Sequence, residues 1–503
     1  MRLYPTGPLR GPVTNHITFH SLMNLDSLLV LGASTSWPFI VLALGILFIV
    51  VAIGVFRFHA FVALILAAIL VGVLASSLPG DDTGNHVINA IELSMTEFGV
   101  TAGKIAWVIG VAAIIGVCLM ESGAADRIVR GLVRTLGEKR AGWAMMIAAF
   151  FLSIPVFFDT VFFLIIPLAQ ALAFRLGKRY VFFVMCVCAG GAITHGLVPP
   201  TPGPLVMIET LELDLGFAMI MGIVLGLPVA AFGIWLARRM DDKLKLELRE
   251  SPMVKIADLE SIVSKDDKEL PSFFMSILPV VLPVFLIALW SSVKAFGSGE
   301  ASMLNSVIEV LGNKNLAMAL GTLIAIYLMA SQRKMKLGPL WKEMEPAIAT
   351  AGTIILITSA GGAFGAMIRH AGVGDAVKAA TEGTGFSFLL LAWIIAAVMK
   401  VAQGSGTVSM ITTSGIMAAI MGIGGGGEMM VLPYHPVYIF AVIAFGSQVG
   451  SWMNDSGFWV VCKLSGFTES ETLKTWTVML AALGVVGLIE VLIVSTILPM
   501  TGG

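Results

Sequence analysis

Four short segments place ionisable, hydroxyl or amide side chains beside glycine or proline within apolar stretches. The segments are 153–160, 194–204, 403–407 and 454–457. Polar side chains and interrupted helices are costly at membrane depth, and they persist where protein or a water-filled cavity satisfies them. The pattern therefore predicts one central polar cavity in which an anion, a polyol or a proton can bind.

Three ionisable residues in these segments are candidate proton carriers, namely Asp159, His195 and Asp455. A carboxylate in an apolar hairpin, as Asp159 is between Phe158 and Thr160, is a functional candidate at membrane depth. Histidine titrates near neutral pH, so His195 can carry a proton or donate to a hydroxyl. The alternative is structural, because either aspartate can cap a helix N-terminus and the histidine can tie unwound backbone together.

Hydroxyl and amide side chains of the same segments are candidate substrate ligands. Backbone N–H groups of the glycine-rich run 403–407 can bind a carboxylate at the N-terminus of the following helix. Prolines within 199–204 interrupt a helix, and they either expose carbonyls to a ligand or only shape the cavity. Lys400 can neutralise a substrate carboxylate or snorkel outward. The expected ligands are Ser153, Thr160, Thr194, Thr201, Gln403, Ser405, Thr407, Asn454 and Ser456.

The sequence holds no zinc-type His/Glu spacing and no paired Ser–Lys or Asp–Asp protease motif. We therefore expect no enzyme activity, no catalytic residues, no metal ligands and no cofactor. The four cysteines, Cys118, Cys186, Cys188 and Cys462, all lie in apolar segments and are interpreted as packing residues.

The elements that position these residues are membrane helices. The chain is 57% hydrophobic and only 13% charged, whereas a soluble domain carries about 25% charged residues. Such a chain predicts an all-α polytopic protein embedded in a lipid bilayer. A net charge of −1 gives no reason to expect a nucleic-acid partner. Residues 1–37 lack the pattern of a cleaved signal peptide and are expected to form an N-terminal extension.

Ten apolar stretches have the length of a full crossing, which needs about 20 residues. They are 38–56, 60–78, 104–121, 181–198, 217–237, 272–292, 315–331, 347–368, 436–453 and 476–499. Two longer stretches, 141–174 and 386–424, are each interrupted at the middle, so each is predicted to form a re-entrant hairpin. Basic residues flank the first hairpin on both sides, which predicts that both of its ends are cytoplasmic. The same rule places the linker 238–271 inside and both termini outside.

The order of features repeats along the chain. Each half has a span, a hairpin and a span that ends in a broken segment, and Gly116, Gly123 and Asp126 align with Gly365, Gly372 and Asp375. Five crossings per half is an odd number, so the second half is inverted relative to the first. The predicted repeats are 38–237 and 272–503. Inverted repeats with interrupted helices are typical of secondary transporters.

Five motifs carry a family resemblance: Ser-Ile-Pro-Val-Phe-Phe-Asp (153–159), Thr-His-Gly-Leu-Val-Pro-Pro-Thr-Pro-Gly-Pro (194–204), Ala-Gln-Gly-Ser-Gly-Thr-Val (402–408), Asn-Asp-Ser-Gly-Phe-Trp (454–459) and Leu-Lys-Thr-Trp-Thr-Val-Met (473–479). From about residue 38 onward the chain resembles the gluconate permease family of the ion transporter superfamily. The resemblance implies a bacterial inner-membrane symporter of gluconate and protons, and a homodimer with scaffold and transport domains. Relatives with similar motifs carry other small hydroxy acids or D-serine.

The leading hypothesis is proton-coupled symport of gluconate or a related small sugar acid or hydroxy acid. A proton would offset the charge of the anion and lower the cost of moving the loaded site. The alternatives are a cation/proton antiporter, which predicts fewer hydroxyl side chains at the breaks, and a sodium-coupled carboxylate transporter. A channel is a further alternative, and only a measurement of flux kinetics would exclude it.

Overall fold

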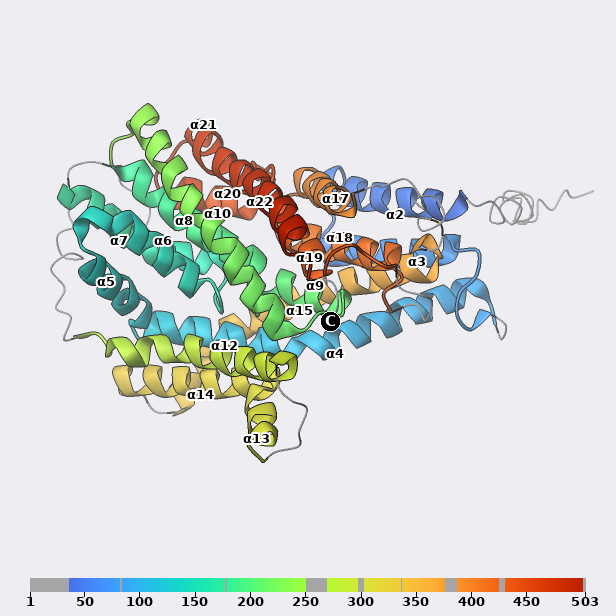
Figure 1. The fold of residues 1–503 in the computed structure, drawn as a ribbon, viewed down its shortest axis with the longest axis horizontal. Coiled ribbons are helices and arrows are strands. Elements are labelled where there is room, and N and C mark those ends of the chain that lie inside the picture. Colours follow the sequence, from blue (N-terminus) through green and yellow to red (C-terminus); the bar gives the residue numbers. More distant parts are fainter. Residues whose placement is uncertain are drawn as a thin grey trace, which may run out of the picture.

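The computed structural model describes residues 36–81, 84–176, 179–249, 269–296, 303–335, 337–374, 376, 387–424 and 430–500. In this part of the chain every regular element is a helix (Figure 1). The helices are α2 (Trp37–Gly54), α3 (Ala60–Leu74), α4 (His86–Glu121), α5 (Ala124–Leu136), η3 (Glu138–Arg140), α6 (Ala141–Leu152), α7 (Phe158–Leu176), α8 (Tyr180–Leu197), α9 (Pro202–Thr210), α10 (Leu215–Leu244), α12 (Phe273–Phe296), α13 (Met303–Gly312), α14 (Lys314–Arg333), α15 (Leu337–His370), α17 (Phe388–Gln403), α18 (Gly406–Ile420), α19 (Val437–Gly446), α20 (Ser456–Leu464), α21 (Glu469–Thr472), η5 (Leu473–Thr477) and α22 (Val478–Ile497).

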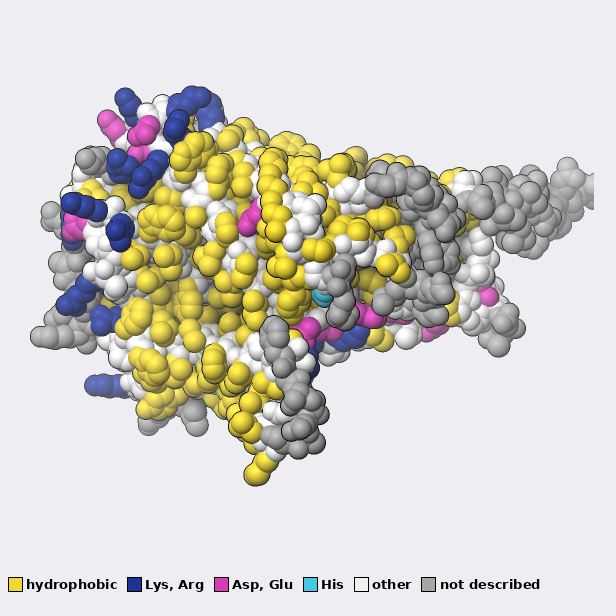
Figure 2. Space-filling view, in the orientation of Figure 1, with side chains coloured by type: hydrophobic (Ala, Val, Ile, Leu, Met, Phe, Trp, Pro, Cys, Tyr) yellow, Lys and Arg dark blue, Asp and Glu magenta, His cyan; other side chains and the backbone are white. Residues whose placement is uncertain are grey.

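Nine helices of the described residues are long and apolar enough to cross a membrane. Large apolar side chains on their outer faces, such as Trp107, Phe285 and Leu323, are more than half exposed. Such exposure suits contact with lipid, because a soluble surface rarely carries so much apolar area. The face seen in Figure 2 is mostly apolar, and Lys and Arg side chains gather at its left and upper-left margins, around the ends of α5, α7 and α10. We call this margin the basic end.

The expected crossings coincide with helices, with two corrections. The stretch 60–78 forms only α3, which ends at Leu74 and, with 15 residues, is shorter than a full crossing. The stretch 436–453 is not a continuous helix, because α19 ends at Gly446 and the chain stays irregular as far as the start of α20 at Ser456. Gly450 has φ +75° within this interval, a left-handed conformation that glycine adopts without strain. The broken segment is therefore longer than the 454–457 expected. The earlier break is shorter than expected, since α8 continues to Leu197.

Two pairs of helices are joined at tight tips. Helices α6 and α7 meet at 153–157, and α17 and α18 meet at Gly404 and Ser405. Three of these four helices are short, with 12, 16 and 15 residues, but α7 has 19 and is long enough to cross. That length differs from the expectation that each half of a hairpin is too short to span. The inverted relation of the two halves remains a prediction.

Glycines let helix backbones touch where the two pairs pack against long helices. A Cβ added to Gly365 of α15 would lie 2.6 Å from the Cα of Gly415 in α18. A Cβ on Gly190 of α8 would lie 2.2 Å from the carbonyl oxygen of Met146 in α6. Real Cβ atoms essentially never approach so closely, so any larger residue would push these helices apart. Each tip is thus held by one helix that contacts a longer neighbour directly.

The expected domain boundaries fall partly outside the described residues. Almost all of the extension 1–37 and most of the linker 238–271 lie there. The beginning of the linker is described, and α10 runs into it as far as Leu244.

At the other end of α10, the Asp214 carboxylate accepts from the Phe217 backbone N–H at 2.9 Å and also bonds Ser291 and Lys294 of α12. Partial burial would raise the pKa of Asp214, but these bonds outweigh it and hold the pKa below its ordinary value.

Candidate functional site

The tips of both helix pairs and both broken helices line one polar cavity of about 600 Å³. This volume is within the range of small-molecule sites, about 300–1,000 Å³. Nine of the twelve residues expected at the site line it: Asp159, Thr160, His195, Gln403, Ser405, Thr407, Asn454, Asp455 and Ser456. Segments far apart in the sequence therefore meet here, as their shared composition predicts.

The other three expected ligands lie outside the cavity lining. Ser153, Thr194 and Thr201 are buried in the surrounding protein. The Thr201 hydroxyl donates to the carbonyl oxygen of Val198 at 2.8 Å, which satisfies the backbone where α8 ends. The buried hydroxyl oxygens of Ser153 and Thr194 have no hydrogen-bond partner among the described residues. The assignment of these three as ligands gains no support from the geometry, because none of them lines the cavity.

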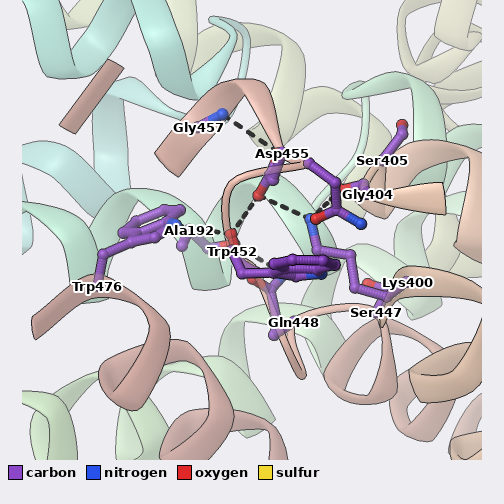
Figure 3. A network of polar contacts seen from close by, with 12 residues as sticks. Ala192, Lys400, Gly404, Ser405, Ser447, Gln448, Trp452, Asp455, Gly457 and Trp476 are labelled. Atoms are coloured by element: carbon purple, nitrogen blue, oxygen red, sulfur yellow. Dashed lines mark hydrogen bonds and ion pairs between the residues drawn. The ribbon is translucent and has the colours of Figure 1, made fainter. Parts of the chain in front are cut away.

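Lys400 is the cationic side chain that lines the cavity in the described part of the chain. It lies near the end of α17 and is buried, so the snorkelling alternative is wrong. Its ammonium donates to the carbonyl oxygen of Gly404 at 2.5 Å and to Asp455 Oδ2 at 2.7 Å (Figure 3). A charge at this depth is stable only with such partners. The sequence pattern alone did not decide its direction, because the partner lies 55 residues further on.

Asp455 both pairs with Lys400 and caps α20. Its Oδ1 accepts from the Gly457 N–H at 3.2 Å, and its Oδ2 also accepts from the Ser451 hydroxyl. The Ser451 hydroxyl in turn accepts from Trp476 Nε1 at 2.6 Å. This network joins α17, the break before α20 and η5, as Figure 3 shows. The cap expected as the structural alternative is present, and it coexists with the ion pair.

The α17–α18 tip is fitted closely against the broken segment. Gly404 has φ +89°, and a Cβ there would lie 2.1 Å from the carbonyl oxygen of Asn454. Ser405 caps α18 by accepting from the Val408 N–H at 3.3 Å. The amide of Gln403 donates to the Ser405 carbonyl at 2.7 Å, while its buried Oε1 has no partner among the described residues. The tip therefore offers a helix N-terminus and an unpartnered acceptor to the cavity.

The α6–α7 tip brings a second carboxylate to the cavity. Asp159 lies in the first turn of α7 and is exposed. Phe158 beside it packs on Trp476, with ring centroids 5.0 Å apart. Asp159 and Thr160 also line an adjacent depression of about 580 Å³, whose wall includes Lys463. Asp159 is thus placed between the cavity and a second opening of the surface.

His195 faces the cavity from the last turn of α8. Its Nδ1 is buried without a partner among the described residues, and its ring lies edge-on to Phe157 with centroids 6.3 Å apart. Beside it, Gln448 Nε2 donates to the carbonyl oxygen of Ala192 at 3.3 Å. The unpartnered nitrogen can accept from or donate to a bound hydroxyl, according to its tautomer.

Several lining residues were not among the expected ligands. They are Phe157, Phe158, Thr350, Ser447, Gln448 and Trp476, together with Lys400. Trp476 belongs to the 473–479 motif, so its signal was available. Ser447 and Gln448 were missed because the stretch 436–453 was interpreted as an unbroken span. No cluster of three or more His, Cys, Asp or Glu suited to a metal ion occurs within the residues described.

The described residues form nine apolar helices of crossing length, and interrupted helices line a polar cavity. These features define the class of multi-pass membrane transport proteins. The chain matches the model of the GntP family permeases over residues 37–497 and belongs to that family. This family consists of permeases and not of enzymes. The correspondence confirms the resemblance that the five motifs indicated.

Relatives of known name agree with this placement. The chain is 34% identical over 458 residues to a gluconate permease of Pseudomonas aeruginosa, covering 90% of this chain and 96% of that one. It is 28% identical over 461 residues to the L-idonate transporter of the Gnt-II system of Escherichia coli, covering 92% and 100%. The crystal structure of the Alcanivorax borkumensis YdaH transporter aligns with a TM-score of 0.58 at 14% identity, over 88% of this chain and 98% of that chain. That likeness shows a shared fold.

Proposed function

We propose that this protein is a proton-coupled symporter of gluconate or a closely related sugar acid in the bacterial inner membrane. The observation that carries the proposal is the position of Lys400, a buried cation between a helix tip and a ring of hydroxyl and amide side chains. A cation beside the N-terminus of α18 suits a carboxylate. The polar side chains suit the hydroxyls of a polyol.

The substrate carboxylate would bind at Lys400 and the first turn of α18. The unpartnered Oε1 of Gln403 would accept from one substrate hydroxyl, and His195 would contact another. Ser405, Thr407, Asn454 and Ser456 complete the polar lining. The names of the relatives, which specify gluconate and L-idonate, support a six-carbon sugar acid. Ser153, Thr194 and Thr201 have no part in this binding scheme.

Three residues that line the cavity are available to carry the proton: Asp159, His195 and Asp455. We assign the role to Asp159. The described residues offer Asp159 no ion pair, whereas Asp455 is held by Lys400 and by the α20 cap. A carboxylate without a fixed partner can gain and lose a proton without breaking a contact. His195 and Asp455 remain the alternative proton carriers.

The architecture proposed for transport has inverted repeats at 38–237 and 272–503, with the α6–α7 and α17–α18 pairs as re-entrant hairpins. The repeated order of a long helix, a helix pair and a broken helix, seen in α4 to α9 and in α15 to α20, supports it. The homodimer implied by the resemblance stays a prediction. A cation/proton antiporter is disfavoured by the many hydroxyl and amide groups around the cavity, which an antiporter of inorganic cations does not need.

The deciding experiment is uptake of labelled gluconate into proteoliposomes with an inward proton gradient and no sodium. We expect accumulation that a protonophore abolishes, and competition by unlabelled idonate and other sugar acids. Uptake that requires sodium would replace the proton assignment with sodium coupling. Uptake of a different acid alone would overturn the gluconate assignment, and proton efflux in exchange for cations without organic substrate would favour the antiporter.

A further inference from the structure

A second hollow lies at the open end of the α6–α7 pair, away from the tip. It has a volume of about 420 Å³ and is walled by α5, η3, α6 and α7. These helices form the left side of Figure 1, close to the basic end seen in Figure 2. We call it the α5–α7 groove. It shares no lining residue with the polar cavity.

The floor of the α5–α7 groove is apolar. Val129, Met145, Ala171 and Leu172 line it and are buried, with exposures of 1%, 2%, 2% and 8%. Val133 and Leu168 extend this floor between the helices. A soluble anion gains nothing from such an apolar lining, whereas an acyl chain can pack against it.

The rim of the groove carries an excess of positive charge. Among the described residues, Arg130, Arg134 and Arg175 line it together with one carboxylate, that of Glu138. Arg130 is oriented by an ion pair with Asp126 at 2.8 Å, and Arg175 by an ion pair with Glu138. A guanidinium has five N–H donors, so an arginine can bind a phosphate while it keeps other partners.

The sequence of α5 explains how charge and apolar surface meet here. Arg130 and Arg134 are four residues apart and share one face of the helix. Val129 directly precedes Arg130 and is buried, so the basic face of the helix adjoins its apolar face. Basic pockets between membrane helices at the positively charged side of a transporter are suited to anionic lipid headgroups.

We propose that the α5–α7 groove binds one anionic glycerophospholipid. The phosphate lies at Arg130, Arg134 and Arg175, and an acyl chain lies on the apolar floor. The lipid then fills the gap between α5 and both helices of the pair whose tip carries Asp159. The proposal concerns lipid binding and stands independently of the substrate and of the coupling ion.

The test uses the purified full-length protein and native mass spectrometry, with phosphatidylglycerol and phosphatidylcholine of identical acyl chains. We expect wild type to retain phosphatidylglycerol preferentially. Arg134→Gln with Arg175→Gln should lower that retention by about fivefold for each arginine removed, since a basic residue near an anionic surface contributes about 1 kcal/mol. Ala171→Phe, which fills the floor and keeps every charge, should lower the retention of both lipids.

The matched control is Arg238→Gln with Arg239→Gln, which removes two exposed arginines near the same end but outside the groove. We expect this variant to retain phosphatidylglycerol as wild type does. An equal loss in the control, no preference in wild type, or equal competition by glycerol phosphate would overturn the proposal. Size-exclusion profiles and thermal unfolding of each variant establish that a loss reflects the site and not misfolding.

Discussion

The ammonium nitrogen of Lys400 lies 2.7 Å from a carboxylate oxygen of Asp455, and the two side chains are only 4% and 12% exposed. The pair joins the end of α17 to the first residue before α20, across 55 positions of sequence. A substrate carboxylate at this place would meet Lys400 in direct competition with Asp455. Binding would then exchange one partner of the ammonium for another, and leave Asp455 free to rearrange.

Removing one member of this pair should be more harmful to stability than removing both. Lys400→Met or Asp455→Asn alone leaves an uncompensated group in the protein, at a cost of about 3–5 kcal/mol. The double variant leaves neither charge, so it should unfold closer to the wild-type temperature. All three should lose gluconate uptake. Thermal unfolding in detergent and proteoliposome uptake measure the two effects, and a double variant less stable than both single variants would contradict the pairing.

Asp159→Asn should separate binding from proton coupling. The amide cannot release a proton, so the variant should exchange labelled for unlabelled gluconate across the membrane while it fails to accumulate gluconate on a proton gradient. Counterflow and gradient-driven uptake in the same vesicles make the comparison. Loss of counterflow as well would show that Asp159 is needed for binding, and an unchanged gradient-driven uptake would move the proton to His195 or Asp455.

Glu490 provides the matching test of a carboxylate outside the cavity. It lies in α22, does not line the polar cavity, and its Oε2 is buried without a partner among the described residues. An unpartnered carboxylate is costly to bury. Glu490→Gln should therefore keep proton-driven uptake and unfold at the same or a higher temperature. Uncoupled uptake in this variant would identify Glu490 as a proton site.

Gly404→Ala should disrupt the α17–α18 tip. The new methyl would meet the Asn454 carbonyl, and a left-handed conformation costs a non-glycine residue about 1–2 kcal/mol. We expect a lower unfolding temperature and little uptake. Gly352→Ala in α15 is the control, because a Cβ there meets no atom within 4 Å. Comparable losses in both variants would show that the effect is not specific to the tip.

Apolar runs and their interruptions predicted the helices and the segments that meet at the cavity. The course of 447–453 was not predictable in the same way. Val449, Trp452 and Met453 continue the apolar pattern of α19, while Gly450 turns the backbone at φ +75°. Hydropathy records which residues tolerate lipid, and it does not record where a backbone leaves the helical conformation.

The direction of individual side chains was also beyond the sequence pattern. Thr194 and His195 are adjacent in α8, yet one is buried in protein and the other faces the cavity. The polar pattern of the segment does not predict which of the two side chains faces the cavity, because their directions depend on helices from the other half of the chain. Lys400 illustrates the same limit, since its inward direction depends on Asp455.

The charged groups around the cavity have an electrical consequence. With Asp159 and Asp455 ionised and Lys400 protonated, the lining carries one net negative charge, and one gluconate with one proton leaves that sum unchanged. Moving one elementary charge across a membrane potential of 100 mV changes its free energy by about 2.3 kcal/mol. Under this stoichiometry the loaded site carries one net charge inward and the empty site carries the same net charge back outward. The electrical work of the two movements cancels. The cycle would then draw no current, and the pH difference alone would determine how far the substrate accumulates.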